Sequence, residues 1–119
     1  METTNFDLEK ELAQFTCSEH WCQHWLGIKY TDGIKYLADT AKAYWLIDFI
    51  ASAQVVKSVR QEPFQVWRLT VSSDSSSDIS ADDGNGIVVF RKKIEYTDFP
   101  MKTIKLYLCD GILLLPSEY

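Results

Sequence analysis

The hydrophobic pattern changes period near Pro63, and this change predicts two different halves of the chain. Before Pro63, apolar residues recur at helical spacing and then merge into an apolar block over residues 43–53. Helices followed by consecutive strands predict an α+β fold, with N-terminal helices packed on one face of a four-stranded antiparallel meander sheet. A fifth strand is expected if residues 26–31 join the sheet. After Pro63, apolar and polar residues alternate as in β-strands over residues 64–71, 86–96, 102–109 and 111–116.

The helical half is expected to contain two or three segments. A start resembling a capping box at Thr4 predicts a first helix over residues 5–16. A second helical pattern covers residues 34–59 and is expected to break near Thr40. Its central part is apolar on nearly every side, which is typical of a buried helix. The predicted core combines inward positions of both halves: Leu37, Ala41, Trp45, Phe49, Trp67, Leu69, Val88, Phe90, Ile94, Leu106 and Leu108.

The length of 119 residues suits a single domain over 1–119, with a helical part in 1–62 and a sheet part in 63–119. The segment 72–86 is rich in serine, aspartate and glycine, and this composition predicts a mobile, solvated loop between the first two strands. The pair Asp110-Gly111 predicts a tight hairpin between the last two strands.

Charge and cysteine content indicate the compartment. The formal net charge is −5, and much of the acidity lies in segment 72–86. The chain has 3 cysteines, an odd and low number that favours free thiols in a reducing compartment. The N-terminal segment lacks an apolar leader, and the longest apolar block is too short to span a bilayer. We therefore expect a cytoplasmic protein without a membrane partner, and nothing in the sequence calls for a cofactor.

Four basic residues are predicted to share one face of the sheet. Strand alternation places Arg68, Arg91, Lys93 and Lys105 on the face turned away from the helices. Some proteins that bind single-stranded nucleic acids present such a face. A solvated face whose Lys and Arg stems cover the strand backbone explains the same pattern. We favour the solvated face, because a nucleic-acid footprint normally makes a domain basic and this chain is acidic.

A second cluster contains metal-ligand types. Cys17, His20, Cys22 and His24 lie close together in the sequence, and thiolates and imidazoles are zinc ligands. The usual zinc order, two close cysteines followed at a distance by two histidines, is missing. The four residues also alternate with tryptophans, so a packed aromatic segment is favoured over a metal site.

Asp48 is the single charge in the apolar block. A buried carboxylate needs a hydrogen-bond partner or a raised pKa, so Asp48 is a candidate buried acid. Three alternatives stay open: a catalytic acid, an acceptor satisfied by a core donor, which we favour over the catalytic acid, or a residue kept wet because this flank of the helix is an interface. An enzyme using Asp48 or His24 has the least support, because no complete reactive group surrounds either residue.

The last predicted strand is wholly apolar. If Ile112, Leu113, Leu114 and Leu115 end a meander, they form an apolar sheet edge that invites pairing with another chain. The chain also has 4 Trp, 6 Tyr and 6 Phe, residue types that anchor interfaces. These features predict a non-enzymatic protein-interaction module whose partner is itself or another protein. On this hypothesis Leu113→Lys would weaken a dimer.

Three stretches resemble a known family. The strings YTDGIKYLA (30–38), AYWLIDFIASAQ (43–54) and LYLCDGILLLPSEY (106–119) are similar to those of a family of small bacterial proteins catalogued only as a domain of unknown function. The resemblance covers the chain from about Phe15 onward. It implies a stand-alone bacterial domain, and it brings no activity, ligand or residue role.

Overall fold

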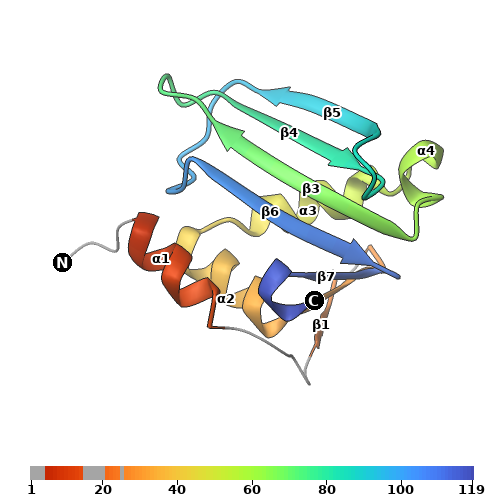
Figure 1. Ribbon diagram of the computed structural model, residues 1–119, viewed down its shortest axis with the longest axis horizontal. Helices are drawn as coiled ribbons and strands as arrows, with labels where there is room; N and C mark the ends of the chain where they lie inside the picture. Colours follow the sequence, from red (N-terminus) through yellow and green to blue (C-terminus); the bar gives the residue numbers. More distant parts are fainter. Residues whose placement is uncertain (1–4, 15–20, 25) are drawn as a thin grey trace.

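One seven-stranded sheet, with helices packed against it, organises the chain (Figure 1). The computed structural model describes residues 5–14, 21–24 and 26–119. The helices are α1 (Asn5–Leu12), α2 (Asp32–Ala41), α3 (Tyr44–Ala53), α4 (Lys57–Arg60) and the short 3-10 helix η1 (Pro116–Glu118). The strands are β1 (Trp21–Gln23), β2 (Lys29–Thr31), β3 (Phe64–Val71), β4 (Ser77–Asp82), β5 (Val88–Ile94), β6 (Thr103–Cys109) and β7 (Ile112–Leu114).

The predicted four- or five-stranded antiparallel meander is wrong. The strand order is β1-β2-β7-β6-β3-β4-β5, and the sheet is mixed because β2 and β7 run parallel. A strand near residues 26–31 does form, as β2, but it joins the sheet beside the C-terminal strand. The N-terminal half therefore contributes two strands to the sheet as well as helices.

A strand also occupies the segment that was expected to be a mobile loop. β4 pairs with β3 along its whole length and with β5 on its other side. Its inward positions, Ser77, Ile79 and Ala81, are buried, so the strand has the alternation of a half-buried sheet. Small and polar side chains hid this alternation in the sequence. The turn before β4 is ordered by Asp74, whose carboxylate accepts hydrogen bonds from the hydroxyl (2.6 Å) and amide (3.0 Å) of Ser76. These bonds lower the pKa of Asp74.

The C-terminal strand is an interior strand of the sheet. The predicted hairpin at Asp110-Gly111 is confirmed: both residues have positive φ (50° and 81°), and β6 pairs with β7 across it. β2 covers the opposite side of β7. This position gives the backbone groups of β7 hydrogen-bond partners on both sides, and it removes the reason for treating the strand as an exposed edge.

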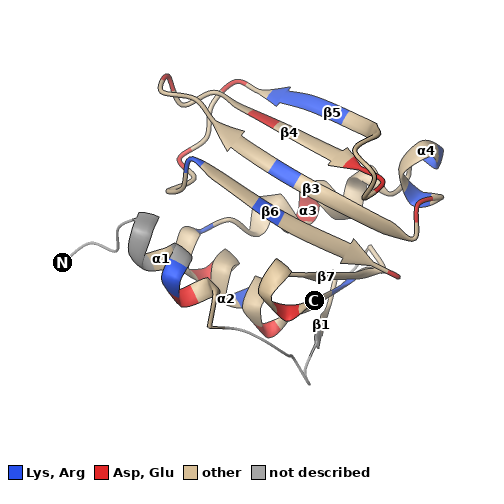
Figure 2. Cartoon of the chain, in the orientation of Figure 1, with Lys and Arg blue, Asp and Glu red and all other residues tan. Residues whose placement is uncertain are grey.

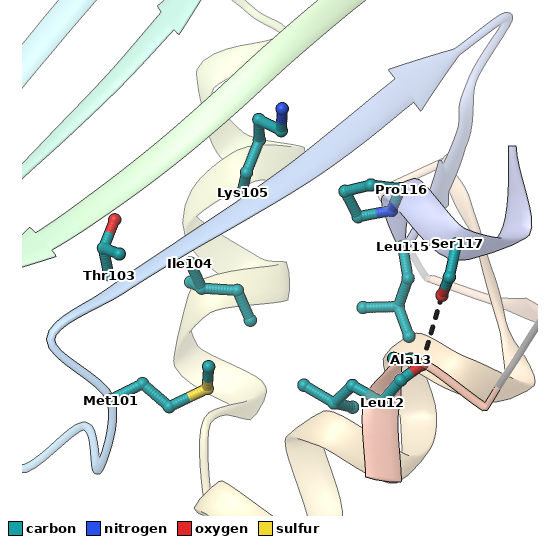
Figure 3. Close-up of a pocket in the computed structure, with 9 residues that line it drawn as sticks. All are labelled: Leu12, Ala13, Met101, Thr103, Ile104, Lys105, Leu115, Pro116 and Ser117. Carbon is teal, nitrogen blue, oxygen red and sulfur yellow. Dashed lines mark hydrogen bonds between the residues drawn. The ribbon is translucent and has the colours of Figure 1, made fainter. Parts of the chain in front are cut away.

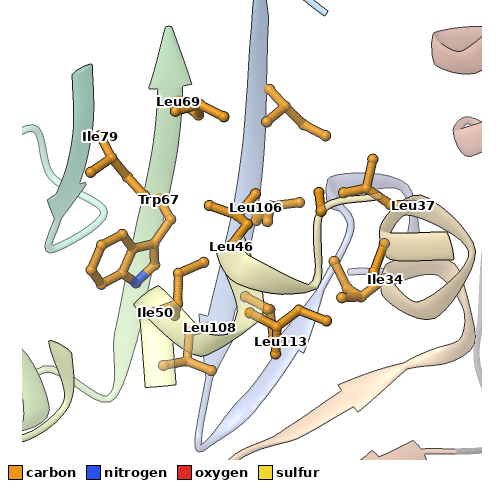
Figure 4. Close-up of a cluster of buried hydrophobic side chains, with 14 of the residues drawn as sticks. Ile34, Leu37, Leu46, Ile50, Trp67, Leu69, Ile79, Leu106, Leu108 and Leu113 are labelled. Atoms are coloured by element: carbon orange, nitrogen blue, oxygen red, sulfur yellow. The ribbon is translucent and has the colours of Figure 1, made fainter. Parts of the chain in front are cut away.

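The core lies between the sheet and the helices (Figure 4). Most predicted core residues are buried or pack against the buried cluster, and Phe49 of α3 meets the rings of Trp67 and Phe90 edge-on at centroid distances of 6.4 and 6.0 Å. Val88 was predicted wrongly, since it is 55% exposed. A bulge between β4 and β5 pairs Asp82 with Val88 and so interrupts the alternation that the sequence pattern assumes.

The helix break predicted near Thr40 is confirmed. Lys42 adopts a left-handed conformation (φ 53°), which ends α2 and lets α3 begin two residues later. No helix among residues 5–14, 21–24 and 26–119 has the length and apolar character needed to cross a membrane.

A buried amide connects the helices to the sheet. Gln65 on β3 exchanges two hydrogen bonds with Gln54 after α3 (3.0 and 2.9 Å) and donates to the carbonyl of Val59 in α4 (2.9 Å). Its Oε1 also accepts from the indole of Trp67 (2.9 Å). A buried polar group with complete hydrogen bonding contributes specificity, because any shift in packing would leave it unsatisfied.

The C-terminal segment is held against the start of α2. The Glu118 carboxylate accepts hydrogen bonds from the Thr31 hydroxyl (2.6 Å), the Leu115 amide (3.0 Å) and the Gly33 amide (3.4 Å). Thr31 is also the N-cap of α2 and accepts from the Ile34 amide at 3.3 Å. A carboxylate at a helix N-terminus is favoured by the helix dipole.

This contact requires glycine at position 33. A Cβ there would lie 2.5 Å from Glu118 Oε1 and 2.8 Å from Leu115 Cδ1. In Gly33→Ala the clash should lower the free energy of unfolding by about 1–3 kcal/mol. The higher helix propensity of alanine should return roughly 1 kcal/mol of this loss. Urea unfolding measures the change, and in a Glu118→Ala background the cost should shrink. A raised unfolding midpoint for Gly33→Ala would show that the segment moves aside freely.

Candidate functional site

The sheet face turned away from α3 brings the predicted basic residues together (Figure 1). The strand registers place Lys105 opposite Arg68, Arg68 opposite Ser80, and Ser80 opposite Arg91. These residues form one row across β6, β3, β4 and β5, and Figure 2 marks the Lys and Arg positions of these strands in blue. Lys93 is two residues from Arg91 on β5 and therefore lies on the same side of the sheet. We call this side the open face. The prediction that the four basic residues share a face matches these registers.

The open face also carries two acids whose place on the sheet the sequence pattern did not predict. Because β4 was taken for a loop, Asp78 and Asp82 were not placed on the sheet. Asp82 is buried and forms an ion pair with Arg68. Asp78 lies opposite Lys93 in the β4–β5 pair. The face is therefore of mixed charge, and Arg68 is held by an internal partner.

An aromatic cluster borders this row. The rings of Phe64, Tyr107 and Tyr119 contact one another pairwise, with centroid distances of 5.1, 5.4 and 5.3 Å. The Lys105 ammonium lies 5.6 Å from the Tyr107 ring centroid, within the range of a cation–π interaction. Tyr119 remains 72% exposed, so the cluster is an aromatic surface at one end of the basic row.

The two residues named as enzyme candidates, His24 and Asp48, contact each other. His24 Nε2 lies 2.6 Å from Asp48 Oδ1, and the Leu26 amide donates to His24 Nδ1 at 3.0 Å. His24 is buried, but the Asp48 side chain is 62% exposed. The expectation of a buried Asp48 is therefore wrong: α3 turns its Asp48 flank outward, and the acid stays wet while it binds His24.

The hydrogen bonds of His24 define its tautomer. Because the Leu26 N–H donates to Nδ1, that nitrogen carries no hydrogen, and the proton of the neutral ring sits on Nε2 and is donated to Asp48. Both ring nitrogens thus have partners within the protein. This arrangement ties the turn after β1 to α3, and in it His24 offers no lone pair to a substrate or a metal.

The four candidate metal-ligand residues, Cys17, His20, Cys22 and His24, lie only partly within the described residues. Cys17 and His20 lie outside the described residues. Cys22 on β1 pairs with Tyr30 on β2. The pKa of Tyr30 is raised, mainly because the side chain is partly desolvated and secondly because Cys22 lies close to it. Among residues 5–14, 21–24 and 26–119, no group of three or more His, Cys, Asp or Glu side chains has a geometry suited to a metal ion.

An apolar cavity of about 340 Å³ lies beside β6 (Figure 3). Leu12 of α1, Met101, Ile104 and Leu115 line it, and the Ser117 hydroxyl closes one side by donating to the Leu12 carbonyl at 3.1 Å. Such a cavity has the size and apolar lining to accept a small apolar group. Of the predicted interface residues only Leu115 reaches it. Leu113 and Leu114 are buried within the sheet and Ile112 is half-buried.

The fold and the open face define a small α+β protein. Its one mixed sheet has α3 on one face, and the other face is open and carries charged and aromatic side chains. The chain belongs to a family of unknown function, DUF6876, whose family model matches residues 6–119. This match confirms the resemblance seen in the sequence. No curated protein and no solved structure matches the chain.

The His24–Asp48 contact is expected to stabilise the fold. Asp48→Ala removes the acceptor of the buried His24 Nε2–H, and we expect it to cost about 1 kcal/mol in the free energy of unfolding. Ser52→Ala is the matched control, because Ser52 is an exposed residue one turn further along α3. Urea unfolding compares the two variants. Equal stabilities would mean that the contact contributes nothing to folding.

Proposed function

We propose that this protein is a non-enzymatic protein-interaction module that associates with a second copy of itself through the open face. The observation that supports this most strongly is the cluster of Phe64, Tyr107 and Tyr119 beside a row of charged residues. Tyrosine and arginine are over-represented among the residues that carry binding energy at interfaces.

The charge pattern of the open face favours a second copy as partner. A face of one sign repels its copy, whereas this face combines Arg91, Lys93 and Lys105 with Asp78 and Asp82. In a two-fold dimer the same patch meets itself, so the half-buried Asp78 on β4 of one copy can approach bases on β5 or β6 of the other, whereas Asp82 stays in its internal ion pair with Arg68. The C-terminal strand residues Ile112–Leu115, which first suggested self-association, have internal partners and are not part of this proposal.

The proposal predicts a dimer that depends on Tyr119. Sedimentation velocity of the wild-type chain at tens of micromolar should give the mass of a dimer, and Tyr119→Ser should weaken the dimer about tenfold or more, a cost of roughly 1.4 kcal/mol. Tyr96→Ser is the matched control, since Tyr96 is 71% exposed against 72% for Tyr119 and lies outside the cluster. A wild-type chain that stays monomeric, or equal effects of the two variants, would refute dimerisation through this face.

Nucleic-acid binding is the second candidate function, and the row of Lys105, Arg68 and Arg91 supports it, together with rings on which bases could stack. The acids on β4 oppose it, because they reduce the positive potential of the face. We therefore place it after protein interaction.

This second candidate predicts a salt-dependent loss of affinity. Arg91→Ala combined with Lys93→Ala should weaken binding of a labelled single-stranded oligonucleotide and reduce the slope of log K against log salt by about 1.4. Lys35→Ala combined with Lys42→Ala controls for total charge, because both lysines are exposed in or just after α2, away from this face. If the two double variants bind alike, the open face is not a nucleic-acid site.

A further inference from the structure

β5 ends the strand order of the sheet, so one of its sides has no neighbouring strand among the described residues. An unpaired strand edge presents main-chain donors and acceptors that another strand can bind. Which groups point outward follows from the registers, because successive residues of an antiparallel strand direct their N–H and C=O groups to opposite sides.

The two-residue hairpin at Asp110-Gly111 fixes the starting point, since it makes Cys109 and Ile112 a hydrogen-bonded pair. Alternation then directs the backbone groups of Leu106 toward β3, and those of its partner Trp67 toward β6. The Val71 amide, which has the same parity as Trp67, donates to the Lys102 carbonyl at 2.7 Å, in agreement with this assignment.

The same alternation continues to β5. The backbone N–H and C=O groups of Arg68 and of its partner Ser80 point toward each other's strands. One residue along β4, the backbone groups of Ile79 therefore point toward β5, and those of its partner Lys92 point toward β4. The N–H and C=O groups of Arg91 and Lys93 therefore point off the edge of the sheet. On this same free side, the Ser58 hydroxyl of α4 donates to the Val89 carbonyl at 3.5 Å.

The side chains along this edge are basic. Arg91, Lys92 and Lys93 follow one another and all are exposed. Arg91 and Lys93 project on the open face, and the inner neighbour of Arg91 is the uncharged Ser80. Asp78 lies opposite Lys93 and neutralises part of its charge from the inner side.

We propose that the free edge of β5 binds an extended acidic segment of a partner protein by antiparallel strand addition. The outward backbone groups of Arg91 and Lys93 bond to the segment's main chain, and carboxylates at alternate positions of the segment lie over the two basic side chains. The basic residues disfavour basic strands and favour acidic ones, which gives the edge selectivity. A second β5 does not fit, because antiparallel pairing centred on Arg91 would set basic residues against basic residues. The inference goes beyond self-association and holds for a monomer as well.

The test uses a labelled octapeptide of alternating threonine and glutamate, with a threonine–lysine octapeptide as its charge control. Fluorescence anisotropy should show saturable binding of the acidic peptide and none of the basic one. Residues of the peptide opposite Arg91 and Lys93 turn their N–H groups toward β5. N-methylation at the glutamates should therefore abolish binding, and N-methylation at the threonines should leave it largely intact.

Two protein variants separate charge from backbone. Arg91→Ala removes the charge and keeps the outward N–H, whereas Arg91→Pro removes both, and proline is tolerated at an edge position whose N–H faces solvent. We expect Arg91→Pro to bind the acidic peptide about tenfold more weakly than Arg91→Ala does.

Three outcomes would overturn the proposal. The first is that the basic peptide binds as well as the acidic one, and the second is that the acidic peptide does not bind. Binding that survives N-methylation at the glutamates would show a surface for polyanions with no strand pairing. A single-stranded oligonucleotide measured in parallel identifies that case, because its affinity should be equal for Arg91→Ala and Arg91→Pro.

Discussion

The parallel pairing of β2 with β7 is the contact on which the architecture depends. β7 is short, and the backbone N–H and C=O groups on both of its sides need hydrogen-bond partners. The hairpin with β6 supplies one neighbour, and the other comes from the N-terminal half, where Lys29 pairs with Ile112 and Tyr30 with Leu113. α2 begins directly after β2, so this pairing also places the helix over the sheet. The carboxylate of Glu118 then binds Thr31 and the start of α2.

The sequence pattern predicted the parts of the fold that rest on local rules. The helix break near Lys42, the Asp110-Gly111 hairpin and the inward alternation of Trp67 and Leu69 all depend on neighbouring residues, and each is present. The meander prediction failed where long-range pairing decides the structure. The apolar character of Leu113 was correctly read as a need for cover, but the sequence does not say that a distant three-residue strand provides it.

The site could be predicted only in part, for a related reason. The common face of Arg68 and Arg91 could be predicted, because it follows from alternation alone. β4 could not, since buried Ser77 and Ala81 give almost no hydrophobic signal, and with β4 the acids of the open face were lost. The local sequence around Asp48 is apolar, yet its partner His24 lies in a turn twenty-four positions earlier. This contact could be predicted only from the knowledge that the turn packs on α3, which the sequence pattern does not supply.

The place of β7 also constrains how the chain acquires its fold during synthesis. A protein is made from its N-terminus, so β1, β2 and α2 leave the ribosome long before residues 112–114 exist. Until then β2 lacks the neighbour it has in the finished sheet, and Thr31 lacks the carboxylate of Glu118. Closing so long a loop carries an entropic cost that only the completed core repays. Residues 112–118 thus complete the domain, and a nascent chain that stops short of them leaves β2 paired with β1 alone.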